Sequence, residues 1–308
     1  EALIPKEMLS LPQNEKEVFY RDWRLLDVDY LVVGSASQGA LPDGVVVTFS
    51  IINISREKVI KRSISSGSAN YLTTLAHVMS DRIYKEINGI PGIFSTKILY
   101  INKEQSPDEK YYLKLAGIDG RNDSVLFSSY EPLMSPSWSS DGKKVAYVSF
   151  EEGTSRIFIQ EIHSGDRRAL KSEKEGINSS PNWSPGDKYL SAVLSKKGNP
   201  DIYLYDLKKN SWKQLTVHFG IDTEPDWSPD GKKLIFTSNR SGSPQIYEMT
   251  VSNRKIRRKT FEGSYNARAR YTPDGRSFVF VHRREGLFHI AVQSLRTGKI
   301  KILTDTLL

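Results

Sequence analysis

The sequence predicts an α+β N-terminal domain followed by an all-β propeller, and three observations predict it. Before residue 91, three strand patterns are followed by one amphipathic helical pattern. After residue 91, an aromatic turn motif recurs every 44 or 45 residues. Each repeat contains four short strand patterns, which is typical of a propeller blade. We therefore expect a small α/β domain over residues 1–91 and a propeller over residues 92–308.

In the N-terminal domain the first predicted elements are strands. Two apolar runs, residues 30–33 and 45–54, flank Pro42-Asp43-Gly44, whose residue types favour a turn. In the second run one set of alternate residues is apolar, which predicts a strand with one apolar face. A third strand is expected around residues 58–64. Together these strands predict a small sheet.

The next predicted element is a helix. Apolar residues recur at three- and four-residue spacing at Leu72, Leu75, Met79 and Ile83, which indicates one amphipathic helix packed on the sheet. Ser68 is the candidate N-cap, and Gly89 followed by Pro91 is a stop signal. We expect the domain boundary at Pro91-Gly92, because the sequence becomes periodic after it.

The periodic part is defined by four copies of an aromatic turn motif. Its aromatic positions 138, 183, 227 and 271 are 45, 44 and 44 residues apart. In three copies Asp-Gly closes the motif, where Asp bonds its own backbone and Gly permits positive φ. In Pro185-Gly186-Asp187 the last two residues are exchanged, so a different turn type is expected there. The four copies are Pro136-Ser137-Trp138-Ser139-Ser140-Asp141-Gly142, Pro181-Asn182-Trp183-Ser184-Pro185-Gly186-Asp187, Pro225-Asp226-Trp227-Ser228-Pro229-Asp230-Gly231 and Ala269-Arg270-Tyr271-Thr272-Pro273-Asp274-Gly275.

The same order of strands follows each motif. A first strand comes after the turn, at residues 145–150, 189–194, 234–237 and 278–282. A second strand follows at residues 156–162, 201–207, 245–251 and 287–293, and a shorter one closes the unit, as at 213–216 and 299–304. Residues 97–102 and 111–118 are expected to form strands of one further blade. We interpret Trp138, Trp183 and Trp227 as packing between blades and give them no functional role.

Composition excludes several classes of chemistry. The chain has 308 residues, of which 38% are hydrophobic and 26% charged, as in ordinary globular proteins. It contains no cysteine, so disulfides, thiolate nucleophiles, cysteine zinc sites and iron–sulfur clusters are excluded. The chain contains no run of about 18 apolar residues, which is the length needed to cross a bilayer. The chain begins at Glu1 without a signal-peptide pattern, so we expect any such peptide to have been removed or left out.

The net charge of +8 is confined to one sector of the chain. Residues 251–300 contain 12 Lys and Arg against three acidic residues. The basic run at residues 254–259 has few aromatic neighbours, which favours a solvated edge strand over a base-stacking platform. We therefore expect no nucleic-acid partner, and nucleic-acid binding by this sector is the less favoured alternative.

No catalytic or metal-binding pattern is present in the sequence. The five histidines lack metal-ligand spacing, and no nucleophile elbow, phosphate loop or dinucleotide motif occurs. Asp222 and Glu224 lie before the third aromatic strand, and Glu131 lies in a comparable place before the first. A glycosidase-type carboxylate pair is the alternative interpretation of these residues. The favoured prediction is a protein that is not an enzyme and uses no cofactor or metal.

Several segments resemble the TolB family, the periplasmic propeller proteins of the Tol-Pal system. The turn motif occurs in many propellers, but its combination with a preceding α/β domain is more specific. The resemblance covers nearly the whole chain. It is carried by Asp29-Tyr30-Leu31-Val32-Val33-Gly34, Ile87-Asn88-Gly89-Ile90-Pro91-Gly92, Leu133-Met134-Ser135-Pro136-Ser137-Trp138-Ser139, Asn199-Pro200-Asp201-Ile202-Tyr203, Asp222-Thr223-Glu224-Pro225, Phe236-Thr237-Ser238-Asn239-Arg240 and Pro244-Gln245-Ile246-Tyr247.

The resemblance implies a non-enzymatic scaffold in the periplasm. Members of the family bind Pal, the peptidoglycan-associated lipoprotein, over one mouth of the propeller and contact TolA through an N-terminal extension. The Tol-Pal system supports outer-membrane integrity, cell division and protein transport, and colicins exploit it for import. Other outer-membrane proteins are further candidate partners, whereas insertion into the membrane is not expected.

The residues that the resemblance assigns to Pal binding precede the aromatic strands. Strand starts of successive blades converge on the central opening, so short polar side chains there would form a ring of hydrogen-bonding groups. Such a ring could dock a protein. The alternative is a propeller enzyme or carbohydrate-binding module with carboxylates at the mouth. The assigned residues are Met134, Ser135, Pro136, Asn178, Ser179, Ser180, Asp222, Thr223, Glu224 and Arg268.

Two departures from the family pattern set further expectations. Family members have six blades, whereas residues 92–308 accommodate about five repeats. We therefore expect the protein to continue past Leu308 into a last blade. We also expect the N-terminal domain to be incomplete at its start, without the extension that contacts TolA.

Overall fold

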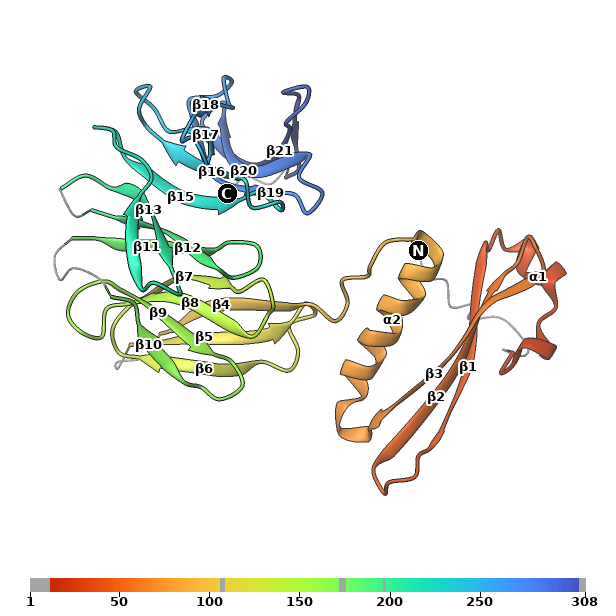
Figure 1. The fold of residues 1–308 in the computed structure, drawn as a ribbon. Coiled ribbons are helices and arrows are strands. Elements are labelled where there is room, and N and C mark those ends of the chain that lie inside the picture. The colour runs from red at the N-terminus through yellow and green to blue at the C-terminus, as the bar shows by residue number, and fades with distance from the viewer. Residues whose placement is uncertain (1–11, 106–108, 172–175, 196–197, 305–308) are drawn as a thin grey trace. The chain divides into compact units, whose positions relative to one another are not determined.

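The chain forms two compact units, which Figure 1 shows as ribbons. The computed structural model describes residues 12–105, 109–171, 176–195 and 198–304. The first unit contains the residues up to Ile98 together with Ala116–Asn122, and the second contains Leu99–Leu115 and the residues from Asp123 onward. The predicted fold class, an α+β domain before an all-β propeller, is confirmed. The predicted boundary at residue 91 stays a prediction.

The N-terminal unit is built on a three-stranded antiparallel sheet of order β1-β2-β3. The three predicted strands and the helix after them are confirmed. Ser68 accepts a hydrogen bond from the Asn70 amide and so caps the short turn before the helix, and Gly89 ends the helix with a φ of +73°. The elements are η1 (Glu15–Glu17), α1 (Tyr20–Leu25), β1 (Tyr30–Gln38), β2 (Gly44–Asn53), β3 (Lys58–Ser68), η2 (Ala69–Tyr71) and α2 (Leu72–Asn88).

The main apolar cluster of this unit joins α1 to the sheet. Trp23 of α1 packs with Val33 of β1 and with Ile52 and Ile54 at the end of β2. Helix α2 lies along the sheet, where Arg82 donates a hydrogen bond to Ser65 of β3, but no residue of this helix is buried. The amphipathic pattern thus predicted the helix, while its apolar side chains remain partly exposed.

The propeller unit consists of successive antiparallel sheets. The first has three strands among the described residues, and each of the next four has four strands in chain order. The first sheet contains β4 (Lys97–Glu104), β5 (Lys110–Gly117) and β6 (Ser124–Ser129). The second contains β7 (Leu133–Trp138), β8 (Lys144–Ser149), β9 (Arg156–Glu161) and β10 (Arg167–Ala169), and the third β11 (Asn178–Trp183), β12 (Tyr189–Leu194), β13 (Asp201–Asp206) and β14 (Ser211–Gln214). The fourth contains β15 (Asp222–Trp227), β16 (Lys233–Ser238), β17 (Gln245–Thr250) and β18 (Ile256–Arg258), and the fifth β19 (Tyr265–Tyr271), β20 (Ser277–Arg284), β21 (Leu287–Ser294) and β22 (Ile300–Ile302).

The repeated tryptophans pack between neighbouring sheets, as predicted. Trp183 lies in a buried cluster with Ala146 of the preceding sheet. Trp227 lies in another with Ile202 of the preceding sheet. Trp138 is half-buried and packs on a cluster that contains Leu113 of the first sheet. Because a tryptophan packs at each of these three junctions, the repeat specifies its own core.

The exchanged turn differs from its counterparts, as predicted. Gly142, Gly231 and Gly275 have φ of +69°, +68° and +65° at the fourth position of their turns. In the third sheet the Asp187 amide donates to the Ser184 carbonyl at 3.0 Å, which places Gly186, with φ of +76°, at the third position. A glycine with positive φ there is typical of a type II turn.

The basic run lies on an edge strand, as predicted. Its residues form β18 and the connections around it, and β18 is the outermost strand of the fourth sheet. Arg257 faces Glu248 across the strand pair, and Lys259 Nζ lies 3.8 Å from a Glu248 oxygen. Lysine and arginine at such an edge oppose pairing with another chain.

Candidate functional site

The innermost strand of each four-stranded sheet contains a β-bulge with a left-handed residue. The pairing register shifts within β7, β11, β15 and β19. At these shifts Ser135, Ser180, Glu224 and Arg268 have φ of +51°, +49°, +56° and +56°. Such a conformation costs a non-glycine residue about 1–3 kcal/mol and occurs preferentially where a site needs it. A bulge changes the direction in which a side chain of its strand points, and here the bulge occurs at the equivalent position of four strands.

These four residues line one cavity of about 640 Å³. The strands that carry them are consecutive neighbours, because β7 contacts β11, β11 contacts β15 and β15 contacts β19. Two positions further along each strand lies a second layer of lining residues, namely Ser137, Asn182, Asp226 and Arg270. The mouth of the propeller, as we call this cavity, is therefore lined by two layers of mostly polar side chains.

Glu224 belongs to the layer formed by the four left-handed residues, and it joins two neighbouring sheets there. Its carboxylate accepts from Arg268 Nε at 2.8 Å, from the Arg268 amide at 3.1 Å and from Thr237 Oγ1 at 3.0 Å. The Glu224 side chain is mostly covered, whereas 73% of the Arg268 side chain is exposed. The negative charge is therefore enclosed, and the positive group faces the open cavity.

Asp226 has the corresponding role in the second layer. It accepts from Asn182 Nδ2 at 3.1 Å and from the Tyr271 amide at 2.8 Å, so it bridges three consecutive sheets. Burial raises the pKa of this carboxyl, although Arg270 and the two hydrogen bonds act in the opposite direction. Asp226 thus fixes the distances between the strands that form the mouth.

The carboxylates near the mouth are each paired with an arginine. Glu224 binds Arg268, Asp226 lies 3.8 Å from Arg270, and Asp222 is held by Arg240 at 2.7 Å. General acid–base catalysis needs a carboxyl that can exchange a proton with substrate. Asp222 and Glu224 are instead engaged in structural ion pairs, which does not favour the glycosidase alternative. Within the described ranges, no three His, Asp or Glu residues are grouped to hold a metal ion.

The structure divides the predicted site residues into three groups. Met134, Ser135, Pro136, Ser180, Glu224 and Arg268 line the mouth together. Ser179 and Thr223 are half-buried and lie beside it in the same strands. Asn178 and Asp222 are buried and hold the strand starts, because Asn178 binds the Ser155 backbone and Asp222 binds Arg240. Their side chains therefore do not present themselves to a partner, contrary to the expectation from the sequence.

The sequence analysis missed the second layer of the mouth. Ser137, Asn182, Asp226 and Arg270 each directly precede the aromatic residue of the motif. Since alternate residues of a strand share a face, these positions face the same way as a lining residue two positions earlier. The signal for this layer is the polar or charged residue directly before the aromatic position in all four repeats.

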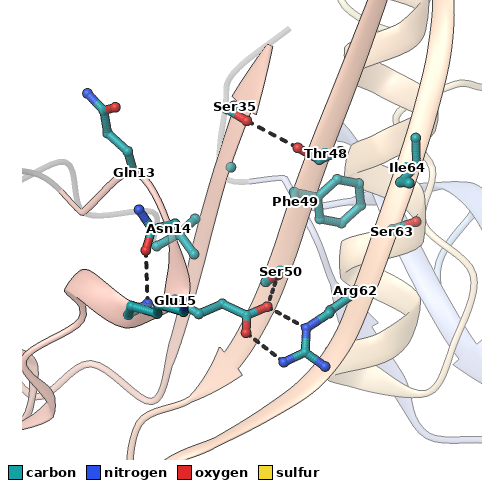
Figure 2. Close-up of a pocket in the computed structure, with 13 residues that line it drawn as sticks. Gln13, Asn14, Glu15, Ser35, Thr48, Phe49, Ser50, Arg62, Ser63 and Ile64 are labelled. Carbon is teal, nitrogen blue, oxygen red and sulfur yellow. Dashed lines mark hydrogen bonds and ion pairs between the residues drawn. The ribbon is translucent and has the colours of Figure 1, made fainter. Parts of the chain in front are cut away.

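A second cavity of about 640 Å³ lies in the N-terminal unit, where Figure 2 shows its lining. Glu15 accepts from Arg62 Nε at 2.7 Å and from Arg62 Nη2 at 2.6 Å, and Ser50 also donates to it. The hydrogen bond from Arg62 is the main reason that the pKa of Glu15 is lowered. The mouth of the propeller is the better candidate site, because left-handed residues from four successive strands line it.

Comparisons with known proteins point to one family. A family model described as the TolB beta propeller domain matches residues 84–308, and one described as the TolB amino-terminal domain matches residues 1–60. The Tol-Pal system protein TolB of Alcanivorax borkumensis is 43% identical over 197 residues, which are 64% of this chain and 45% of that protein. The protein of the same name from Hahella chejuensis is 42% identical over 58% of this chain and 42% of its own length. The chain thus spans less than half the length of these curated relatives.

Solved structures agree with the family models. The crystal structure of TolB from Acinetobacter baumannii superposes with a TM-score of 0.90 at 38% identity, covering 97% of this chain and 75% of that one. A puromycin hydrolase and an oligogalacturonate lyase are similar at TM-scores of 0.53 and 0.52, but at 10% and 15% identity they show the fold alone. In the part of the chain that the structure describes, no helix has the length and apolar composition needed to span a membrane.

Proposed function

Because the chain belongs to the TolB family, a family of non-enzymatic scaffold proteins, we propose that it is a periplasmic docking protein of the Tol-Pal system. Its partner at the mouth of the propeller is the lipoprotein Pal. Through this contact the protein supports outer-membrane integrity, cell division and protein transport, and it offers colicins a route for import. TolA, bound through an N-terminal extension, and other outer-membrane proteins are further partners.

The main support for the proposal is that each of four strands has a strained bulge at the mouth. Four non-glycine residues in the left-handed region re-aim their side chains into one cavity, and no free carboxylate pair accompanies them. Strain of this kind is retained where a surface must keep a defined shape for binding. The lining suits a protein partner, because Ser135 and Ser180 offer hydroxyls while Met134 offers an exposed apolar side chain.

Arg268 is the charged group most available to that partner. Its Nε is bound to Glu224, and among the described residues its two terminal nitrogens have no hydrogen-bond partner. A guanidinium presented in this way favours a carboxylate or carbonyl oxygen of the partner. We therefore place an acidic or carbonyl group of Pal against Arg268.

Calorimetry with the soluble domain of Pal tests the proposal. Wild-type chain is expected to bind, and Arg268→Ala is expected to weaken binding about tenfold or more, because a centrally placed arginine contact is lost. The matched control is Arg257→Ala on the edge strand β18, which should bind as the wild type does. Absence of binding by the wild type, or equal losses in both variants, contradicts the proposal.

A further inference from the structure

The connection before β15 exposes three apolar side chains in five residues. Val217, Phe219 and Ile221 are 78%, 87% and 45% exposed, while Thr216 and Asp222 on either side are buried. Isolated exposed apolar residues are ordinary, but a contiguous group on a soluble protein marks an interaction site. Phe219 is the largest of the three and the most exposed.

This connection is held in place from two sheets. Asn199, which precedes β13, donates to the carbonyls of His218 and Gly220 at 2.6 and 3.0 Å. Asn239, which follows β16, accepts from the Ile221 amide at 2.7 Å. The Phe219 ring also lies against the His218 ring, with centroids 4.1 Å apart. Phe219 is therefore presented on a fixed backbone, so binding does not have to order the loop.

Gly220 is required for this arrangement. A Cβ at this position would lie 2.7 Å from Asn239 Oδ1 and 3.1 Å from the backbone of Arg240. Any larger residue would push the connection away from the sheet that clamps it. The residue beside Phe219 thus lacks a side chain because the backbone approaches the next sheet closely.

The next repeat presents a second phenylalanine in the corresponding connection. Phe261, before β19, is 74% exposed, and the Arg258 guanidinium lies 5.1 Å from its ring centroid. Gln245 donates to the Gly263 carbonyl at 3.2 Å, and Asn266 donates to the Glu262 carbonyl at 2.8 Å. Two neighbouring connections therefore each carry an exposed aromatic ring on a hydrogen-bonded backbone.

Phe219 is close in sequence to a residue that lines the mouth. Phe219 is five residues before Glu224, which limits the distance between their backbones to about 17 Å at roughly 3.4 Å per residue. A standard interface covers roughly 800 Å² on each partner, equivalent to a disc of about 16 Å radius. A protein that covers Glu224 and Arg268 is large enough to reach Phe219.

We propose that Phe219, supported by Phe261, is the aromatic anchor of the docking surface, and that the partner in the mouth places an apolar patch on it. The inference rests on the proposed function, because the occupant is the same protein, the soluble domain of Pal. The mouth supplies polar contacts at the centre, and the clamped connections supply apolar area at its border. Large rigid aromatic side chains of this kind dominate binding energy in protein interfaces.

Calorimetry with the Pal domain and three variants tests the inference. Phe219→Ala is expected to weaken binding at least about tenfold, as for an aromatic hot spot. Phe219→Tyr should retain affinity within about threefold, since the ring area is kept. The matched control is Val125→Ala on β6, the outermost strand of the first sheet, where a side chain that is 51% exposed is truncated. This control should not change affinity.

A fourth variant separates the presentation of the ring from the ring itself. Asn199→Ala leaves Phe219 intact but removes the donor that holds the His218 and Gly220 carbonyls. Binding should weaken about threefold or more, because part of the ordering cost returns. If the wild type does not bind Pal, both this inference and the proposed function fail. If the wild type binds and Arg268→Ala is weakened while Phe219→Ala is not, this inference alone is overturned.

Discussion

The two units of the chain use their apolar side chains in different ways. In the propeller Trp183 and Trp227 are buried at two successive junctions between sheets, and Trp227 sits among fully buried neighbours such as Leu234 and Phe236. In the N-terminal unit the 17-residue helix α2 buries no side chain, and Leu72 at its start is half exposed. The propeller is stabilised mainly by contacts between its elements, whereas α2 depends more on local interactions.

This difference separates local from tertiary determinants of stability. Both units contain well-formed strands, caps and turns, so the same local rules operate in both. Only the propeller repeats a buried contact from sheet to sheet. Equivalent substitutions should therefore have very different effects when they remove packing, and equal effects when they change only backbone conformation.

Truncation of a packed side chain should give the largest contrast. Trp227→Ala in the propeller is expected to cost about 3–5 kcal/mol, because it removes a buried aromatic and leaves a cavity. Leu75→Ala on α2, where the leucine is only half-buried, is expected to cost less than about 1.5 kcal/mol. Urea unfolding of both variants measures the two values. Similar losses would refute the contrast between the units.

Ion pairs should show the next largest contrast. Asp222 is fully buried and receives two bonds from Arg240 Nη2, so Asp222→Ala leaves an uncompensated buried cation and should cost about 3 kcal/mol. Glu15→Gln breaks the more exposed pair with Arg62 in the N-terminal unit and should leave the melting temperature nearly unchanged. Thermal unfolding of the two variants checks this. A large loss in the Glu15 variant would show that the N-terminal unit depends on that pair.

The sequence predicted the elements and the core of the propeller because both are repeated. A motif present four times identified the strands around it, and the tryptophans could only be buried between repeats. In the N-terminal unit a single helical period predicted α2 correctly, but a period cannot tell how completely a helix is covered. The extent of burial depends on what packs against the helix, which the pattern does not contain.

The mouth was only partly predictable, for a physical reason. The left-handed residues are Ser135, Ser180, Glu224 and Arg268, and none of these types signals positive φ as glycine does. The bulge arises from a register shift between strands, which is a tertiary property. Asp222 and Glu224 are alternate residues of β15, so strand alternation does not distinguish them. Asp222 is buried because Arg240 holds its carboxylate, whereas Glu224 lies at the bulge and lines the mouth. A motif match assigned both residues to the surface because it contains no information on the tertiary contact with Arg240 that buries Asp222.

Replacement of a glycine with positive φ by alanine should lower the free energy of unfolding equally in the two units. Gly89 ends α2 with φ of +73°, and Gly231 closes a propeller turn with φ of +68°. Neither has a neighbour that an added Cβ would strike, since Gly231 has only contacts of 3.8 Å or more and Gly89 has none within 4 Å. Alanine should therefore cost about 1 kcal/mol at either position, from backbone strain alone. Denaturant unfolding that gives unequal losses would show that tertiary packing contributes at one of the two turns.

Acidification should give the smallest contrast, in which the propeller responds first. Burial lowers the pKa of His282. The nearby charges of His289 and Arg284 also lower this pKa, whereas Glu262 raises it. His282 Nδ1 lies 2.7 Å from Asn266 Oδ1. The unfolded state then binds more protons than the folded state, so this contribution to stability is present above about pH 6.5 and is lost as pH falls below it. In the N-terminal unit the pKa of Asp81 is also lowered, but this group titrates in a more acidic range.

Although burial raises the pKa of Asp81, hydrogen bonds from Ser95 and from the amides of Phe94 and Ser95 lower it overall. Its contribution is therefore lost only below about pH 3.9, as its folded-state pKa is approached. Thermal unfolding between pH 8 and pH 5 should show a fall in stability that His282→Gln removes and Asp81→Asn does not. An unchanged slope in the His282 variant would mean that another group in the propeller takes up the proton, and the contrast between the two units would then need a different titrating residue.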